Sequence, residues 1–167
     1  YNPNSEDGPL SLNKLHINNI SCEKGGMYIS GLKTGGLLLY NGKRIGMSTT
    51  LPPGTHNARP FREGILFNDT ESNKLRYATP DGKDDCAFSF PLYPKADLLE
   101  SDLDDSGVAR QGFGRGLCAI SDTLIAAGSS PSTISLYDLD QKKMVKTVNI
   151  SMDIRNAIHG LEVWPYY

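Results

Sequence analysis

The side chains best suited to chemistry in this 167-residue sequence are its three histidines, His16, His56 and His159. Each stands at the opening of a short β-type run, and an Asn or Glu follows within three residues. An imidazole gains or loses a proton near neutral pH, and its neutral form binds transition metals. The histidines therefore predict acid/base chemistry or a metal site, provided that the fold brings them together.

An internal repeat indicates how the fold does so. Three segments open with His or Arg and close with a tyrosine: His16–Tyr40, His56–Tyr77 and Arg115–Tyr137. These intervals are 24, 21 and 22 residues long, and the openings, counted on to His159, are 40, 59 and 44 residues apart. A period of about 40 to 50 residues that holds three or four short strands is the size of one β-propeller blade. The recurring tyrosines are expected to pack between blades.

We therefore predict an all-β fold, a β-propeller of about three four-stranded blades plus the first strand of a fourth. The predicted parts are an N-terminal extension over residues 1–12, blades over 13–54, 55–112 and 113–157, and a closing strand over 158–167. The second blade is longer because it holds the acidic stretch 99–107, which is predicted to be an exposed loop. Three blades leave a ring open, so a longer chain or a second copy of this chain is expected to complete it.

Several short motifs resemble those of poorly characterised propellers related to the gluconolactonase and strictosidine synthase superfamily. They are His16-Ile17-Asn18, Ser30-Gly31, Asn68-Asp69-Thr70, Arg115-Gly116-Leu117 and the stretch from Ile158 to Pro165. The resemblance implies a six-bladed ring, of which three blades are half. Members of the superfamily include lactone hydrolases that hold calcium through Glu, Asn and Asp, and condensing enzymes that work without metal. The fold transfers from such a resemblance more safely than the chemistry does.

The repeat also predicts where a site would lie. The inner strand of each blade begins at the mouth of the propeller channel, so equivalent blade positions meet around one axis. The candidate catalytic residues are His56, His159, Glu162 and Arg115, and the candidate substrate-binding residues are Asn18, Asn57, Arg59 and Asn68. In this hypothesis a histidine is the general acid or base, Glu162 orients it or acts as a base itself, and Arg115 stabilises negative charge.

The same convergence allows a metal site. His16, His56 and His159 are candidate ligands of one divalent metal ion. Arg115 argues against a metal, because a permanent cation repels one unless Glu162 or a bound anion neutralises it, and would rather receive a carboxylate or phosphate. In a third alternative the polar side chains only bond channel water and the backbone of neighbouring blades.

Charge, hydropathy and cysteine content narrow the class of protein. With a net charge of −2 and scattered basic residues, the sequence predicts no basic patch that would bind nucleic acid. The longest strongly apolar run, residues 37–40, is far shorter than the roughly 20 residues of a membrane helix. Three cysteines without a CxxC pair suit reduced thiols, so the cytoplasm is the expected location.

Two functions fit these observations. In the first, the channel mouth binds a polar or anionic small molecule and catalyses acid/base or metal-assisted hydrolysis, elimination or isomerisation. In the second, the propeller is a non-catalytic scaffold whose partners bind a blade face or the acidic loop. Polar side chains gathered at one channel mouth would favour the first function, and a channel filled by apolar side chains would favour the second.

Overall fold

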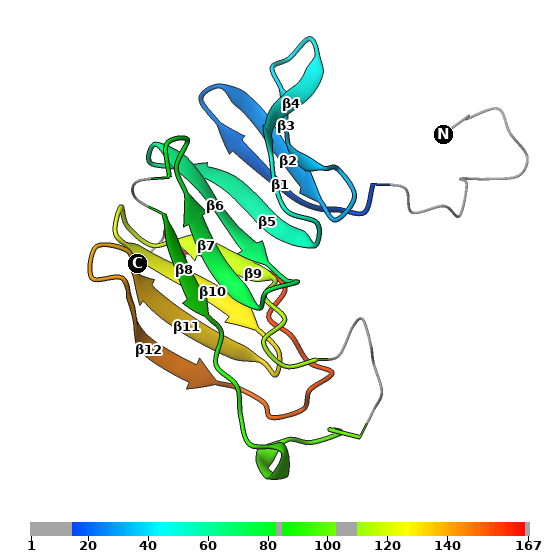
Figure 1. Ribbon diagram of the computed structural model, residues 1–167, viewed down its shortest axis with the longest axis vertical. Helices are drawn as coiled ribbons and strands as arrows, with labels where there is room; N and C mark the ends of the chain where they lie inside the picture. The colour runs from blue at the N-terminus through cyan, green and yellow to red at the C-terminus, as the bar shows by residue number, and fades with distance from the viewer. Residues whose placement is uncertain (1–14, 83–84, 103–109, 166–167) are drawn as a thin grey trace, which may run out of the picture.

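The structure is a computed structural model that describes residues 15–82, 85–102 and 110–165 (Figure 1). Twelve strands in these ranges form three four-stranded sheets, each an antiparallel meander in chain order. The all-β propeller fold predicted from the repeat is therefore confirmed. The N-terminal extension predicted over 1–12 and most of the loop predicted over 99–107 lie outside the described residues.

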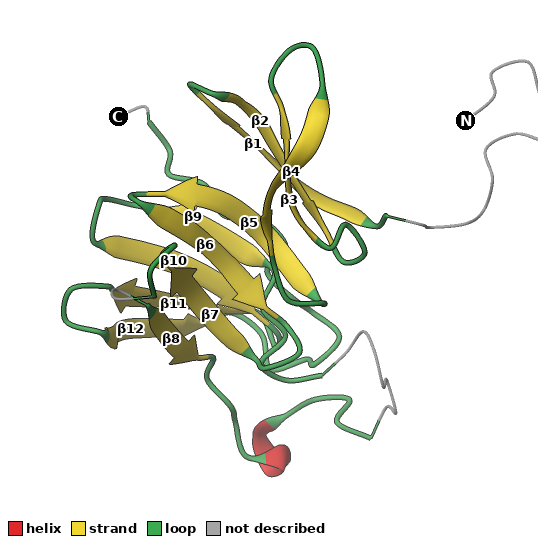
Figure 2. Cartoon of the chain, turned by 45° about the horizontal axis from the view of Figure 1, so that its top comes forward, coloured by secondary structure: helices red, strands yellow, loops and turns green. Residues whose placement is uncertain are grey.

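Each sheet is one blade, and blade 2 stands between blade 1 and blade 3 (Figures 1 and 2). Blade 1 comprises β1 (Ile17–Glu23), β2 (Gly26–Gly31), β3 (Gly36–Tyr40) and β4 (Ile45–Thr50). Blade 2 comprises β5 (Thr55–Phe61), β6 (Gly64–Asp69), β7 (Lys74–Ala78) and β8 (Cys86–Ser89). Blade 3 comprises β9 (Gly116–Ala119), β10 (Leu124–Ser129), β11 (Thr133–Asp138) and β12 (Lys143–Asn149). The short 3-10 turn η1 (Lys95–Asp97) follows blade 2, and no helix in the described ranges is long and apolar enough to cross a membrane.

Two hairpin turns with the same construction set the register of β7 on β6 and of β12 on β11. In blade 2 the Oδ1 atom of Asp69 accepts a hydrogen bond from the backbone N–H of Ser72 at 3.2 Å, and Asn73, the residue after Ser72, has φ 55°. In blade 3 the Oδ1 atom of Asp138 accepts a hydrogen bond from the N–H of Gln141 at 2.8 Å, and Lys142, the residue after Gln141, has φ 50°. An aspartate that bonds its own turn, followed by a left-handed residue, closes a short hairpin.

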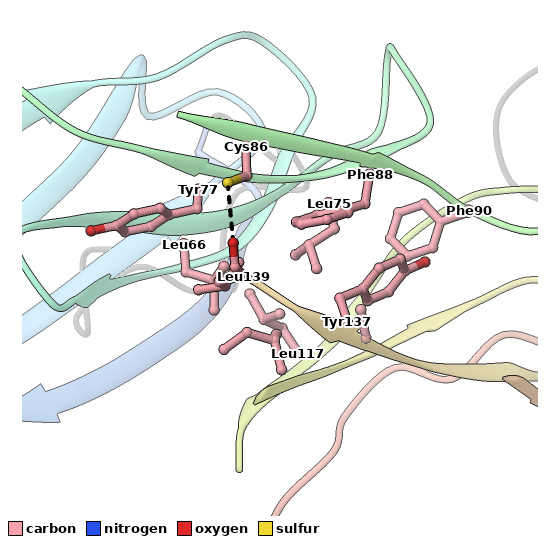
Figure 3. Close-up of a cluster of buried hydrophobic side chains, with 11 residues drawn as sticks. Leu66, Leu75, Tyr77, Cys86, Phe88, Phe90, Leu117, Tyr137 and Leu139 are labelled. Carbon is pink, nitrogen blue, oxygen red and sulfur yellow. Dashed lines mark hydrogen bonds between the residues drawn. The ribbon is translucent and has the colours of Figure 1, made fainter. Parts of the chain in front are cut away.

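The larger hydrophobic core lies between blade 2 and blade 3 (Figure 3). We call the face of a blade that packs on the following blade its forward face, and the opposite face its back face. Leu66 and Leu75 on the forward face of blade 2 and Ile125 and Tyr137 on the back face of blade 3 are almost completely buried. A second cluster joins the forward face of blade 1 to the back face of blade 2. The blades are thus held together chiefly by apolar burial between their faces.

The back face of blade 1 carries two apolar rows that cross all four strands. Residues paired between neighbouring strands share a face, so the register defines each row. One row is Ile20, Ile29, Leu38 and Met47, and the other is Cys22, Met27, Tyr40 and Ile45. Exposed fractions of 55% at Ile20, 51% at Met47 and 62% at Ile45 show that the described part of the chain leaves this face largely uncovered.

The equivalent positions of blade 3 are buried. There Ile125 pairs with Tyr137 as Met27 pairs with Tyr40 in blade 1, and both residues of the blade 3 pair are 0% exposed. Tyr77 of blade 2 instead belongs to a forward face. The recurring tyrosines therefore do not occupy equivalent faces. A shift of one residue in the spacing of a repeat is enough for this, because it moves a side chain to the other face of the sheet.

The C-terminal segment lies against the inner strand of blade 3. The carbonyl oxygen of Ile158 accepts a hydrogen bond from the N–H of Gly116 at 2.7 Å. A Cβ atom at Gly128 would lie 2.5 Å from the Cβ of Ile158, so the close approach requires glycine there. Residues 158–165 nevertheless form no strand. A strand is defined by its ladder of hydrogen bonds with a neighbour, and the described residues hold no fourth blade to supply one, so the predicted closing strand stays a prediction.

We expect the contact between blade 2 and blade 3 to dominate stability. Leu75→Ala removes a fully buried side chain from it and should lower the free energy of unfolding by about 2–5 kcal/mol. The matched control is Leu92→Ala, at a loop position that is 66% exposed, where the loss should be small. Urea denaturation measures both variants. Equal losses would contradict the assignment of the core.

Candidate functional site

A cavity of about 170 Å³ lies where the inner strands of the three blades begin. Six polar side chains from four separate segments of the chain line it: His16, Asn18, His56, Asn57, Arg115 and His159. All six belong to the set that the repeat predicts at the channel mouth. The structure therefore brings together side chains that are up to 143 positions apart in the sequence.

Local breaks in strand register turn these side chains toward the cavity. His56 and Asn57 are consecutive in β5, and a regular strand would point them to opposite faces. The pairing of β5 with β6 slips at this point, and Asn57 has φ 54°, so both residues line the cavity. The first residues of β1 show a similar slip, preceded by His16 with φ 47°. Left-handed residues other than glycine are uncommon and concentrate at functional sites.

The two asparagines of the cavity wall join neighbouring blades. The Nδ2 atom of Asn18 donates to the carbonyl oxygen of Thr55 at 2.9 Å, from blade 1 to the start of the inner strand of blade 2. The Nδ2 atom of Asn57 donates in the same way to the carbonyl oxygen of Arg115 at 3.1 Å, at the start of the inner strand of blade 3. Each asparagine thus fixes the position of the next blade's contribution to the cavity.

His56 is a neutral imidazole at neutral pH. Its Nδ1 atom lies 3.1 Å from the carbonyl oxygen of Gly54, so Nδ1 carries the proton and Nε2 keeps a lone pair. Burial lowers the pKa of His56 from its ordinary value of 6.5 to about 4, the Gly54 hydrogen bond opposes this, and the charge of Arg115 adds to it. His56 is therefore a weaker base than the ordinary histidine that the sequence suggests.

Arg115 is held between an aromatic ring and a histidine. Its guanidinium carbon lies 4.6 Å from the centre of the Phe113 ring, a cation–π distance. Its Nη1 atom lies 3.1 Å from Nε2 and 3.3 Å from Nδ1 of His159. Because an arginine only donates, a ring nitrogen of His159 must accept, which requires the neutral imidazole. Burial and the charge of Arg115 accordingly lower the pKa of His159.

Arg59 and Glu162 line an adjoining groove of about 410 Å³ instead of the cavity. The Nη2 atom of Arg59 donates to the Oδ1 atom of Asn57 at 2.8 Å. The Oε1 atom of Glu162 accepts from the thiol of Cys118 at 3.7 Å and from the N–H of Val163 at 3.1 Å. Burial and the carboxylate of Glu162 raise the pKa of the Cys118 thiol. The cavity and the groove share three residues of their walls, Asn18, Asn57 and His159.

Two parts of the sequence-based site need correction. Asn68 is fully buried and its Nδ2 atom donates to the carbonyl oxygen of Gly116 at 3.2 Å, so this side chain cannot touch a ligand in the cavity. The metal triad does not fit either. Among the described residues no group of three or more His, Cys, Asp or Glu side chains could hold a metal ion. His159 faces the guanidinium of Arg115, which would repel a cation.

Two residues that the sequence did not point to support the site. Phe113 carries Arg115 on its ring and meets His56 edge-on, with ring centres 5.4 Å apart. Gly128 admits the C-terminal segment that delivers His159. Phe113 stands in the glycine-rich stretch 112–116, and nothing in that sequence distinguishes an aromatic ring that contacts an arginine from an ordinary core residue.

No protein-family model matches the chain, and no curated protein sequence matches it. Among solved structures it is similar to the WD40 domain of Pan2 from Neurospora crassa, with a TM-score of 0.51 and 12% identity over 89% of this chain and 41% of that domain. It is also similar to a catalytically inactive virginiamycin B lyase from Staphylococcus aureus with quinupristin, with a TM-score of 0.42 and 15% identity over 77% of this chain and 43% of that one. The chain spans less than half of each. The WD40 likeness supports a β-propeller and no particular family.

The lowered pKa of His56 predicts a specific loss of stability in acid. The unfolded chain, with its histidine pKa near 6.5, takes up this proton before the folded chain does, whose His56 pKa is about 4. The free energy of unfolding should fall as the pH drops from about 6.5 to 4, by at most about 3 kcal/mol from this residue. Urea denaturation at pH 7.5 and 4.5 measures it.

The matched variant for this measurement is His56→Gln, which keeps a polar side chain and cannot titrate. Its loss of stability between the two pH values should be smaller than that of the unchanged chain. Carboxylates that titrate in acid contribute equally to both proteins, so the difference isolates His56. The same pH dependence in both would show that His56 does not carry the effect.

Proposed function

We propose that the axial cavity binds a small polar molecule. The observation that carries this proposal is its lining, which consists only of ionisable and amide side chains brought together from four segments. Convergent polar groups in a concave site favour ligand binding over simple packing. The volume of about 170 Å³ is below the roughly 300–1,000 Å³ of most ligand pockets, so the ligand, or the part of it that enters, is small.

The proposal extends to acid/base chemistry of the kind used in hydrolysis, elimination or isomerisation. The Nε2 lone pair of His56 would accept a proton from the ligand, and Arg115 would stabilise the negative charge that results. The protonated His56 would then return this proton to the ligand, and His159, which shares the cavity with them, would hold the ligand through its ring N–H. Glu162 takes no step in this scheme because it lines the adjoining groove.

A thermal-shift screen tests ligand binding. The panel holds small neutral sugars, polyols, amines, carboxylates and phosphates at constant ionic strength. A ligand at about one hundred times its Kd stabilises the folded chain by about 2.7 kcal/mol, so at least one class should raise Tm by several degrees. His159→Ala should abolish the rise. Asn156→Ala, an exposed change on the same segment outside the cavity, should leave it intact. A panel without any His159-dependent rise would contradict the proposal.

A second candidate function is assembly, and the uncovered back face of blade 1 favours it. Blades 2 and 3 each bury their back face on the forward face of another blade, so the surface that fits blade 1 is a further forward face. A second copy of this chain would supply one. The row of blade 3 that includes Ile134 and Val148 lies on its forward face, and Val148 is 49% exposed.

Light scattering after size-exclusion chromatography tests the assembly. The unchanged chain should have the mass of two copies. The double variant Ile45→Lys with Met47→Lys places two charges on the back face of blade 1 and should have the mass of one. The control Leu92→Lys with Leu99→Lys adds the same charges at exposed loop positions away from both faces and should stay a dimer. A single-chain mass for the unchanged protein would rule out this form of assembly.

A further inference from the structure

The hydrogen-bonding capacity of the two asparagines in the cavity wall is largely used within the protein. Asn18 donates to the carbonyl oxygen of Thr55, and its Oδ1 atom accepts from the Ser30 hydroxyl at 3.0 Å and from the N–H of Asn57 at 3.2 Å. Asn57 donates to Arg115 and accepts from Arg59. The amides are therefore structural parts of the wall. Recognition of a ligand falls to Arg115 and the histidines.

Arg115 is a fixed cation that has no acidic partner among the described residues. No ion pair within 4.0 Å joins it to a carboxylate in the described ranges, and its buried Nε atom has no hydrogen-bond partner. The Phe113 ring supports one face of the guanidinium at 4.6 Å, so the group is held in place. A guanidinium keeps its charge throughout the ordinary pH range. A half-buried cation without a counter-ion is electrostatically unfavourable, so an anion that binds beside it stabilises it.

Among the described residues, positive charge predominates around the cavity. None of the six residues that line the cavity is acidic. A second guanidinium, that of Arg110, lies 5.0 Å from the same Phe113 ring, with its own donors bonded to Asn73 and to the carbonyl oxygen of Thr70. Glu23 and Glu162 line the adjoining groove instead. Burial is the largest cause of the lowered pKa values of His56 and His159, and the charge of Arg115 lowers both further.

His159 supplies a second donor beside the guanidinium. One of its ring nitrogens accepts from Nη1 of Arg115 at 3.1 Å. In the neutral ring the other nitrogen then carries a proton, which it can donate. A guanidinium and an imidazole N–H side by side present donors to an oxygen-rich anion and offer nothing to a cation.

On the basis of the function proposed above, we infer that the axial cavity takes an anionic group, a carboxylate or a phosphate, held by the guanidinium of Arg115. Both groups offer several oxygens to a planar fork of N–H donors. The cavity of about 170 Å³ accommodates a group of a few heavy atoms. The Nε2 lone pair of His56 would accept a hydrogen bond from a neighbouring hydroxyl or amine of the same ligand.

Titration with simple anions followed by NMR tests this inference. The probes are acetate, inorganic phosphate and acetamide, the last being a neutral analogue of acetate, all at constant ionic strength. Acetate or phosphate should shift the resonances of His56 and His159 in a saturable way, and acetamide should not. The stronger of the two anions identifies the source as carboxylate or phosphate.

Three variants assign the binding to Arg115. Arg115→Gln should weaken the anion at least about tenfold, the loss expected for one charge-assisted hydrogen bond. Arg44→Gln removes the same charge from an exposed turn and should have no effect, which separates a specific site from general attraction. Arg115→Lys keeps the charge and loses the fork. It should bind more weakly than the unchanged chain, and it carries the test if the glutamine variant does not fold.

The outcomes separate this inference from the proposed function. If neutral compounds bind in a His159-dependent way while acetate and phosphate show no dependence on Arg115, the anion site is wrong and the ligand-binding function stands. If no compound binds in either experiment, both are wrong. Equal weakening by Arg115→Gln and Arg44→Gln would also overturn the anion site.

Discussion

Each blade of this protein is a four-stranded sheet with apolar side chains on both faces, and such a sheet is stable in water only when its faces are covered. Leu66 and Leu75 of blade 2 meet Ile125 and Tyr137 of blade 3, and this contact forms the larger of the two cores. The stacking of faces fixes where every inner strand begins. The position of the cavity at the axis is therefore a consequence of how the blades pack.

The polar side chains at the axis serve the fold and the site together. Asn18 and Asn57 reach from one blade to the backbone of the next, and the second of these contacts ends on the carbonyl oxygen of Arg115. The same residue sends its guanidinium into the cavity, where Phe113 and His159 hold it. Because these contacts already hold the guanidinium in place, it needs little reorganisation when an anion binds. This favours binding.

The sequence predicted the blades because their spacing repeats, and it predicted the gathering of His16, His56, Arg115 and His159 because equivalent positions of a propeller share an axis. It could not predict the burial of Asn68, because the sequence pattern around an asparagine at the end of a strand is the same whether the side chain faces a ligand or a neighbouring blade. The slip of register at Asn57 has no pattern of its own either. The sequence also does not show how deeply an ionisable side chain is buried, so the lowered pKa of His56 could be recognised only in the structure.

The uncovered back face of blade 1 also bears on the order in which the molecule comes apart. The stability of a repeat protein is approximately the sum of the stability of each unit and of its contacts with neighbours. Blade 2 has two such contacts, and blade 3 has one together with Ile158 of the C-terminal segment against Gly128. Blade 1 has a single contact within the described chain, so we expect its backbone hydrogen bonds to open at the lowest free energy and to exchange with solvent before those around the axis of blades 2 and 3.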